Sequence, residues 1–120
     1  MEMKYEVILM EGVEDFIHDL MPKMEAKALR SIQMLRECGF ELREPHAKTL
    51  KNAEGLKELR VQAGNDICRL FFFHFKGVVY VITSGYVKKQ NKTDIRQINR
   101  ALRLMHEFLK EYDKYETDKL

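Results

Sequence analysis

Two arginines and a glutamate in the middle of the chain have the residue types and the spacing to hold an anion. Glu58 and Arg60 alternate with apolar residues, and Arg69 precedes a run of aromatic residues. If both stretches are strands, Glu58 and Arg60 share one face, and Arg69 shares a face with Phe71 and Phe73. A guanidinium among aromatic rings is costly to bury unless a partner neutralises it. Two interpretations stay open: a cross-strand ion pair between Arg69 and Glu58, or an open basic end of the sheet that binds an anion.

The charge distribution favours a partner that is a polyanion. Residues 56–103 carry 10 basic and 3 acidic side chains, whereas residues 1–55 carry 8 basic and 11 acidic ones. The whole chain has a net charge of only +2, so the positive field is local. A concentrated basic region is typical of nucleic-acid-binding surfaces. A solvated basic face without a partner is the alternative.

Three strands are predicted between residues 56 and 84. Leu56–Val61 alternates apolar and polar residues, Ile67–Phe75 is β-branched and aromatic, and Val78–Ser84 returns after a tight turn at Lys76-Gly77. Gly64-Asn65-Asp66 is the other turn signal. The pattern predicts an antiparallel meander whose middle strand is apolar on both faces and therefore central.

One strand and two helices are expected before the meander, and one helix after it. Tyr5–Met10 is a short apolar run that joins the sheet, and apolar residues then recur at helical spacing on both sides of Pro22 as far as Gly39. Phe40–Glu54 is interpreted as a connection. Thr93 is the predicted N-cap of a final helix with a full apolar stripe, and residues 113–120 form a frayed tail. The prediction is one α+β domain over residues 1–120, in the order βααβββα.

Composition narrows the class of protein further. The chain has 120 residues, 45% of them hydrophobic, which fits one compact domain with one core. We expect no membrane span and no secretory signal. Cys38 and Cys68 are interpreted as free thiols of a cytoplasmic protein, and the four histidines lack the spacing of metal ligands. No metal and no cofactor are expected.

The order of these elements and three local segments resemble a known family. The segments are Glu58-Leu59-Arg60, Arg69 with the aromatic run after it, and Gly85–Thr93 with its lysines. Together they resemble the RelE superfamily of bacterial toxins, and within it the HigB-like, phage Gp49-like branch. The resemblance covers about residues 4–110 and implies a RelE-like fold.

The resemblance also implies a function. The chain is then the toxin of a type II toxin–antitoxin system, a metal-independent endoribonuclease (mRNA interferase) that cuts translated mRNA on the ribosome by attack of a 2′-hydroxyl on the adjacent phosphate. It would inhibit translation and growth until an antitoxin neutralises it. The implied partner is a cognate antitoxin of the helix-turn-helix, HigA-like kind, with a toxin–antitoxin heterotetramer as one assembly. The first two helices and the basic groove are both open as its binding surface.

Roles can be assigned to particular residues on this basis. Phosphoryl transfer at RNA gathers negative charge that arginine donors stabilise, so Arg69 and Arg60 are the predicted phosphate clamp. The remaining predicted catalytic residues are Tyr86, Lys88, Lys89 and Glu58, with Glu58 as a base. The predicted RNA-binding residues are Lys48, Lys51, Lys57, Lys92 and Arg96.

Two further hypotheses use the same fold. A non-catalytic module would bind RNA, the ribosome or DNA with the basic face and would leave no new RNA ends. A structural protein would use its sheet only to hold a partner helix. Salt-sensitive binding without cleavage would indicate the first of these.

Overall fold

The computed structural model describes residues 4–88 and 93–119, with side chains as far as residue 116. Its strands form one five-stranded sheet in the order β1-β5-β4-β3-β2, in which β1 runs parallel to β5 and the other pairs are antiparallel. The elements are β1 (Glu6–Leu9), α1 (Val13–His18), α2 (Pro22–Cys38), the short 3-10 helix η1 (Gly39–Glu41), β2 (Ala47–Thr49), β3 (Lys57–Ala63), β4 (Asp66–Lys76), β5 (Val79–Lys88) and α3 (Ile95–Lys119).

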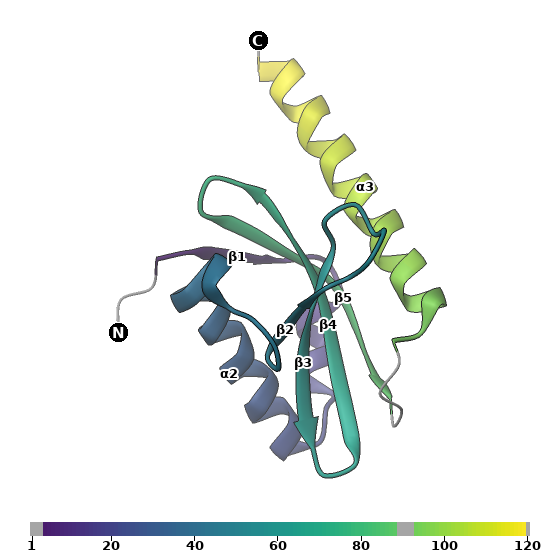
Figure 1. Cartoon of the computed structure of the whole chain (residues 1–120). Coiled ribbons are helices and arrows are strands. Elements are labelled where there is room, and N and C mark those ends of the chain that lie inside the picture. The colour runs from purple at the N-terminus through teal and green to yellow at the C-terminus, as the bar shows by residue number, and fades with distance from the viewer. Residues whose placement is uncertain (1–3, 89–92, 120) are drawn as a thin grey trace.

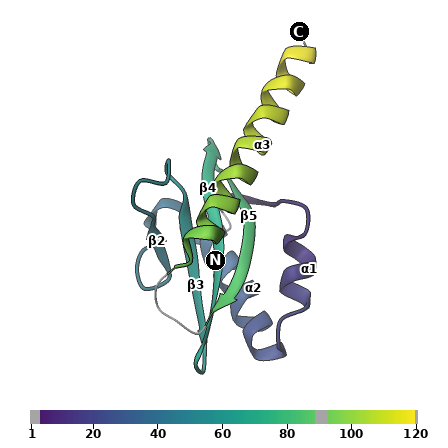
Figure 2. The same ribbon diagram turned by 90° about the vertical axis from the view of Figure 1, so that its right-hand side faces the viewer.

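The architecture has three layers. In Figures 1 and 2 the helices α1 and α2 lie on one side of the sheet and α3 on the other, and the C-terminal half of α3 extends past the end of the sheet. The predicted α+β fold is confirmed, and the predicted elements follow one another in the predicted order, with one additional strand among them. Within the described residues, no helix is both long and apolar enough to cross a membrane.

The sheet contains a strand that the sequence analysis did not predict. β2 lies inside the stretch 40–54 that was interpreted as a connection, and it pairs with the start of β3 through Ala47↔Leu59 and Thr49↔Lys57. A strand of three residues is too short for alternation to show in the sequence. β2 forms the edge of the sheet next to the predicted arginine site.

β5 continues well beyond Ser84, where the sequence analysis ended it. It pairs with β4 as far as Lys88↔Ile67, so Tyr86 and Lys88 lie on the strand itself and not after it. Gly85 permits this, because a Cβ there would lie 2.6 Å from the Leu70 side chain and 2.7 Å from that of Phe16. Gly85, which the prediction left outside the strand, is therefore a close-packing position within it.

β4 is buried on both faces, as its sequence predicted. Cys68, Leu70 and Phe72 point to the layer of α1 and α2, whereas Phe71 and Phe73 point to α3. All five side chains are at most 4% exposed. β4 is thus the central strand, and it fixes Arg69 on the α3 side.

The start and the end of α3 both differ from the prediction. Asp94, and not Thr93, caps the helix, because its Oδ1 accepts the Arg96 N–H at 2.9 Å. The predicted frayed tail at 113–120 is helical as far as Lys119, in a stretch without Gly or Pro to end the helix. Directly before this stretch, Tyr112 packs on Phe75, with the ring centroids 4.6 Å apart.

Candidate functional site

Arg60 and Arg69 lie directly opposite each other on β3 and β4. Like charges in that position destabilise a sheet unless a counter-charge separates them. Glu58 supplies it: its Oε1 lies 2.7 Å from Arg69 Nη1 and 3.8 Å from Arg60 Nε. One carboxylate of the described residues thus lies close to both guanidiniums.

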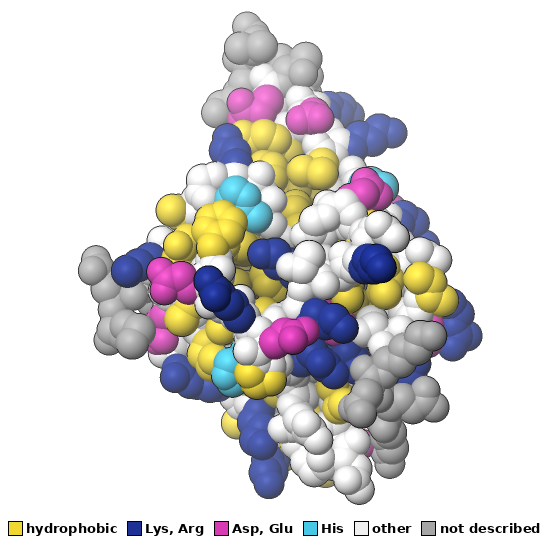
Figure 3. Space-filling model, in the orientation of Figure 1, with side chains coloured by type: hydrophobic (Ala, Val, Ile, Leu, Met, Phe, Trp, Pro, Cys, Tyr) yellow, Lys and Arg dark blue, Asp and Glu magenta, His cyan; other side chains and the backbone are white. Residues whose placement is uncertain are grey.

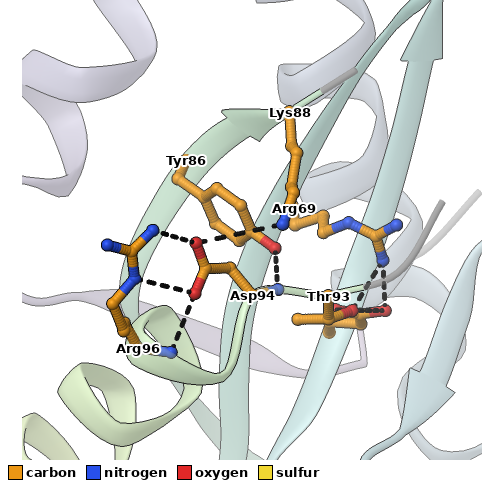
Figure 4. A network of polar contacts seen from close by, with 7 residues as sticks. Arg69, Tyr86, Lys88, Thr93, Asp94 and Arg96 are labelled. Carbon is orange, nitrogen blue, oxygen red and sulfur yellow. Dashed lines mark hydrogen bonds and ion pairs between the residues drawn. The ribbon is translucent and has the colours of Figure 1, made fainter. Parts of the chain in front are cut away.

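Arg69 and Glu58 are buried, each with 1% of its surface exposed. The Thr93 hydroxyl completes the pair: it accepts a hydrogen bond from Arg69 Nη1 at 2.8 Å and donates one to Glu58 Oε2 at 2.8 Å. These bonds offset part of the cost of removing two charges from water. The cross-strand ion pair, one of the two interpretations left open by the sequence, is therefore present. Figure 4 shows Arg69 beside Thr93.

Burial changes what these residues can do. Glu58, predicted as a base, is out of reach of a substrate in this arrangement and instead holds Arg69. Arg60 is different, because its side chain is 28% exposed. Of the two facing arginines, Arg60 is therefore the one whose side chain reaches solvent, while Arg69 and Glu58 are buried.

Tyr86 lies opposite Arg69 on β5, and its ring stacks on Phe71 with the centroids 5.9 Å apart. Its hydroxyl oxygen accepts the backbone N–H of Asp94 at 2.7 Å, as Figure 4 shows. Burial raises the pKa of Tyr86 above its usual value. The phenol therefore keeps its proton at neutral pH and suits the role of a proton donor better than that of a base.

Asp94 forms ion pairs with two further basic residues of the site, Arg96 and Lys88. Its Oδ2 lies 3.1 Å from Arg96 Nη2 and 3.9 Å from Lys88 Nζ (Figure 4). The hydrogen bonds from Arg96 lower the pKa of Asp94, so the carboxylate stays ionised. Arg96, a predicted RNA-binding residue, is thus paired with Asp94 even though its side chain is 87% exposed.

The other predicted residues divide between two sides of the sheet. Lys48 is exposed and lies opposite Glu58 on β2, so it belongs to the arginine site. Lys57 is on the other face, with its ammonium 5.9 Å from the centre of the Phe40 ring. Lys51 is exposed in the β2–β3 connection. Lys89 and Lys92 lie outside the described residues.

Sequence reasoning missed Thr93 as a partner of the buried pair and Asp94 as the centre of a charge cluster. The sequence analysis assigned Thr93 only to the N-cap of the last helix, a position that Asp also favours. The sequence does contain a signal for the buried pair. Charged residues on two neighbouring strands need hydrogen-bond partners if they are buried, and a hydroxyl such as that of Thr93 can supply them. In residues 4–88 and 93–119, no group of three or more His, Cys, Asp or Glu side chains is placed to hold a metal ion.

Comparison with known proteins gives the class and then the family. Among solved structures, the E. coli toxin RelE, a doubly substituted mutant in the free state, matches with a TM-score of 0.62 at 14% identity, over 84% of this chain and 97% of that one. The archaeal RelE–RelB complex from Pyrococcus horikoshii matches with a TM-score of 0.51 at 20% identity, over 76% of this chain and 100% of the matched chain. The fold is therefore that of the RelE toxins.

The match to a family model identifies the family of this chain. Residues 15–106 match the model of the family described as Phage derived protein Gp49-like (DUF891), and the chain belongs to that family. The search of curated protein sequences finds no match. The predicted Gp49-like family is confirmed by the family model, and the predicted RelE-like fold is confirmed by the solved structures.

Proposed function

We propose that this protein is the HigB-like toxin of a type II toxin–antitoxin system. It is an endoribonuclease that cuts translated mRNA on the ribosome without a metal ion, by attack of a 2′-hydroxyl on the adjacent phosphate. Cleavage inhibits translation and growth until an antitoxin neutralises the toxin in the cytoplasm. The fold and the family support the class of protein, and the arginine site supports the chemistry.

The observation that carries the proposal is the pair of facing arginines that share one carboxylate. In-line attack on a phosphodiester passes through a transition state whose negative charge has spread over the phosphate oxygens. Cations already fixed near that charge stabilise it, and a guanidinium can donate two parallel hydrogen bonds to it. Glu58 lies between the two guanidiniums, 2.7 Å from Arg69 Nη1 and 3.8 Å from Arg60 Nε.

Each residue then has a role that fits its burial. Arg60 and Lys48 contact the scissile phosphate and its neighbour from the exposed rim, and Lys88 adds charge beside them. Arg69 is a positioning residue, because its buried charge fixes Glu58 and reinforces the field at Arg60. Tyr86, kept protonated by burial, donates a proton to the leaving 5′-oxygen. Glu58 can act as a base only after Arg69 and Thr93 release it.

The proposed partner is an antitoxin. The archaeal relative of known structure is in complex with RelB. For this chain we propose a cognate helix-turn-helix antitoxin of the HigA kind, which forms a heterotetramer with the toxin.

The test is a map of mRNA 5′ ends after brief induction, with and without a block on translation. Arg60→Ala is compared with the matched control Arg103→Ala, which removes an exposed arginine on α3 that pairs with Glu107 at 3.9 Å. We expect new ends that require translation, and a loss of about a hundredfold in Arg60→Ala but not in the control, as for one positioned donor. Unchanged cleavage in Arg60→Ala would contradict the assigned site.

One observation favours a second candidate function, a non-catalytic RNA-binding module. Both candidate acid–base groups on the described strands are engaged: Glu58 with Arg69 and Thr93, and the Tyr86 oxygen with the Asp94 N–H. A folded protein that binds RNA in a salt-sensitive manner but produces no new 5′ ends would establish the module and refute the nuclease.

A further inference from the structure

A cavity of the described molecule opens at the edge of β3. It has a volume of about 420 Å³ and lies between α2 and the second half of β3. β2 pairs with β3 only over residues 57–59, so β3 has no neighbouring strand on that side from Arg60 onward. His46 O accepts the Arg60 N–H at 2.9 Å where β2 begins, and the groove starts there.

The walls of this groove are positively charged. Lys27 and Arg30 come from α2 and Arg60 comes from β3, with His46 between them, and the described residues that line the groove include no carboxylate. Lys27 Nζ donates to Gln62 O at 3.0 Å, which holds the lysine over the edge of the strand. Figure 3 shows Lys and Arg side chains spread over this face of the molecule.

The cations of the groove are only weakly neutralised. Arg30 Nη1 lies 4.0 Å from Glu37 Oε1, at the limit of an ion pair. Arg60 Nε is buried without a hydrogen-bond partner among the described residues, and its nearest carboxylate oxygen is 3.8 Å away. A buried donor in this state favours an acceptor brought by a ligand, because an unmade hydrogen bond costs free energy.

We propose that this groove binds the sugar–phosphate backbone of single-stranded RNA as it leaves the reaction site. Arg60 belongs to both places: it faces Arg69 across the sheet and also lines the groove. A phosphate beside Arg60 is therefore followed by phosphates beside Arg30 and Lys27, along the edge of β3. The inference rests on the proposed function for the identity of the RNA, and it assigns to α2 a part in RNA binding.

Binding and cleavage are measured separately to test this. The probe is a short fluorescein-labelled single-stranded RNA with 2′-O-methyl riboses, which lack the nucleophile and therefore report binding alone. The variant is Lys27→Ala/Arg30→Ala. The matched control is Lys110→Ala/Lys114→Ala, which removes the same charge from exposed positions on the outer half of α3. Circular dichroism and thermal unfolding verify that both variants are folded.

We expect the groove variant to bind the probe about tenfold more weakly or worse, and the control to bind as the wild type does. The slope of log affinity against log salt should be smaller in magnitude by about 1.4 in the groove variant, because each of two lost phosphate contacts on a single strand contributes roughly 0.7.

Equal affinity and equal slope in the three proteins would overturn the inference, whatever the cleavage map shows. If the wild type never cuts mRNA but still binds the probe more tightly than the groove variant does, the proposed nuclease is refuted and the inference about the groove is supported. Loss of antitoxin affinity with unchanged RNA affinity would assign the groove to the protein partner and overturn the inference.

Discussion

The two faces of β4 differ in polarity: one face is apolar, whereas the other carries a buried arginine. On the side of α1 and α2, Cys68, Leu70 and Phe72 enter a continuous apolar core. On the side of α3, Phe71 is equally buried, but the next residue on that face is Arg69. The buried residues of the apolar face pack with residues of α1 and α2, whereas α3 begins only at Ile95, beside the polar end of the sheet.

The difference shows where the fold leaves room for chemistry. A buried ion pair adds little to stability compared with well-packed apolar side chains of the same size. The apolar face stabilises the domain, and the polar end of the other face holds charge in a fixed place. If this contrast is right, substitutions on the two faces should separate stability from function.

The largest effect on stability is expected at Glu58. Glu58→Ala leaves the guanidinium of Arg69 buried without its carboxylate, so the free energy of unfolding should fall by about 3–5 kcal/mol. Urea denaturation measures the change. The double variant Glu58→Leu/Arg69→Met should recover most of that loss, because it replaces the pair with apolar side chains. A loss below about 1 kcal/mol in Glu58→Ala would show that the pair is not held as described.

A smaller effect is expected at Thr93, which joins the start of α3 to the buried pair. Thr93→Val keeps the shape of the side chain and removes bonds to two charged groups, so unfolding should be easier by about 1.5–3 kcal/mol. Thr49→Val is the matched control, because Thr49 is exposed on β2 and should change stability by less than about 0.5 kcal/mol. Equal effects in the two variants would mean that Thr93 does not stabilise the pair.

The apolar face can be tested through its cysteine. Burial raises the pKa of the Cys68 thiol to about 12, so almost no thiolate forms in the native state at neutral pH. Cys38 is partly exposed. In native protein iodoacetamide should therefore modify Cys38 first and reach Cys68 only on unfolding, as peptide mass spectrometry would record. Rapid native labelling of Cys68 would mean that this face opens more readily than the packing indicates.

The smallest effect is expected at His18, far from both faces. Its hydrogen bond with Glu25, at 2.9 Å, raises the pKa of the imidazole above 6.5. A raised folded-state pKa contributes stability below the unfolded-state pKa of about 6.5, and the contribution disappears as the pH rises through the folded-state value. An NMR titration should show a lower His18 pKa in Glu25→Gln than in the wild type. The same pKa in both proteins would mean that the pair does not form in solution.

The apolar half of this molecule could be predicted from sequence because its signals are periodic. The alternation in β4 fixed which phenylalanines face α3, and Pro22 and Gly39 marked the limits of α2. The Gly85 position could not be interpreted correctly, because its reason is the approach of Leu70 and Phe16 from elsewhere in the chain. Long-range packing of this kind leaves no local pattern.

The candidate site was predictable in part. The arginines and Glu58 were identified from their types and spacing, and their pairing was one of two stated alternatives. Which arginine faces solvent was not predictable, because it depends on Thr93 approaching across the sheet from the start of α3. The groove beside α2 was missed because it forms where β2 ends, and β2 itself was not recognised.

The central claim is that the buried Arg69–Glu58 pair serves RNA cleavage, because an apolar pair of similar size would stabilise the fold equally well. The most direct measurement compares mRNA 5′ ends in cells that express the wild type or Glu58→Leu/Arg69→Met, at equal amounts of folded protein. We predict that the double variant folds with near-wild-type stability and that its cuts fall by about a hundredfold or more. Wild-type cleavage by this folded variant would contradict the account.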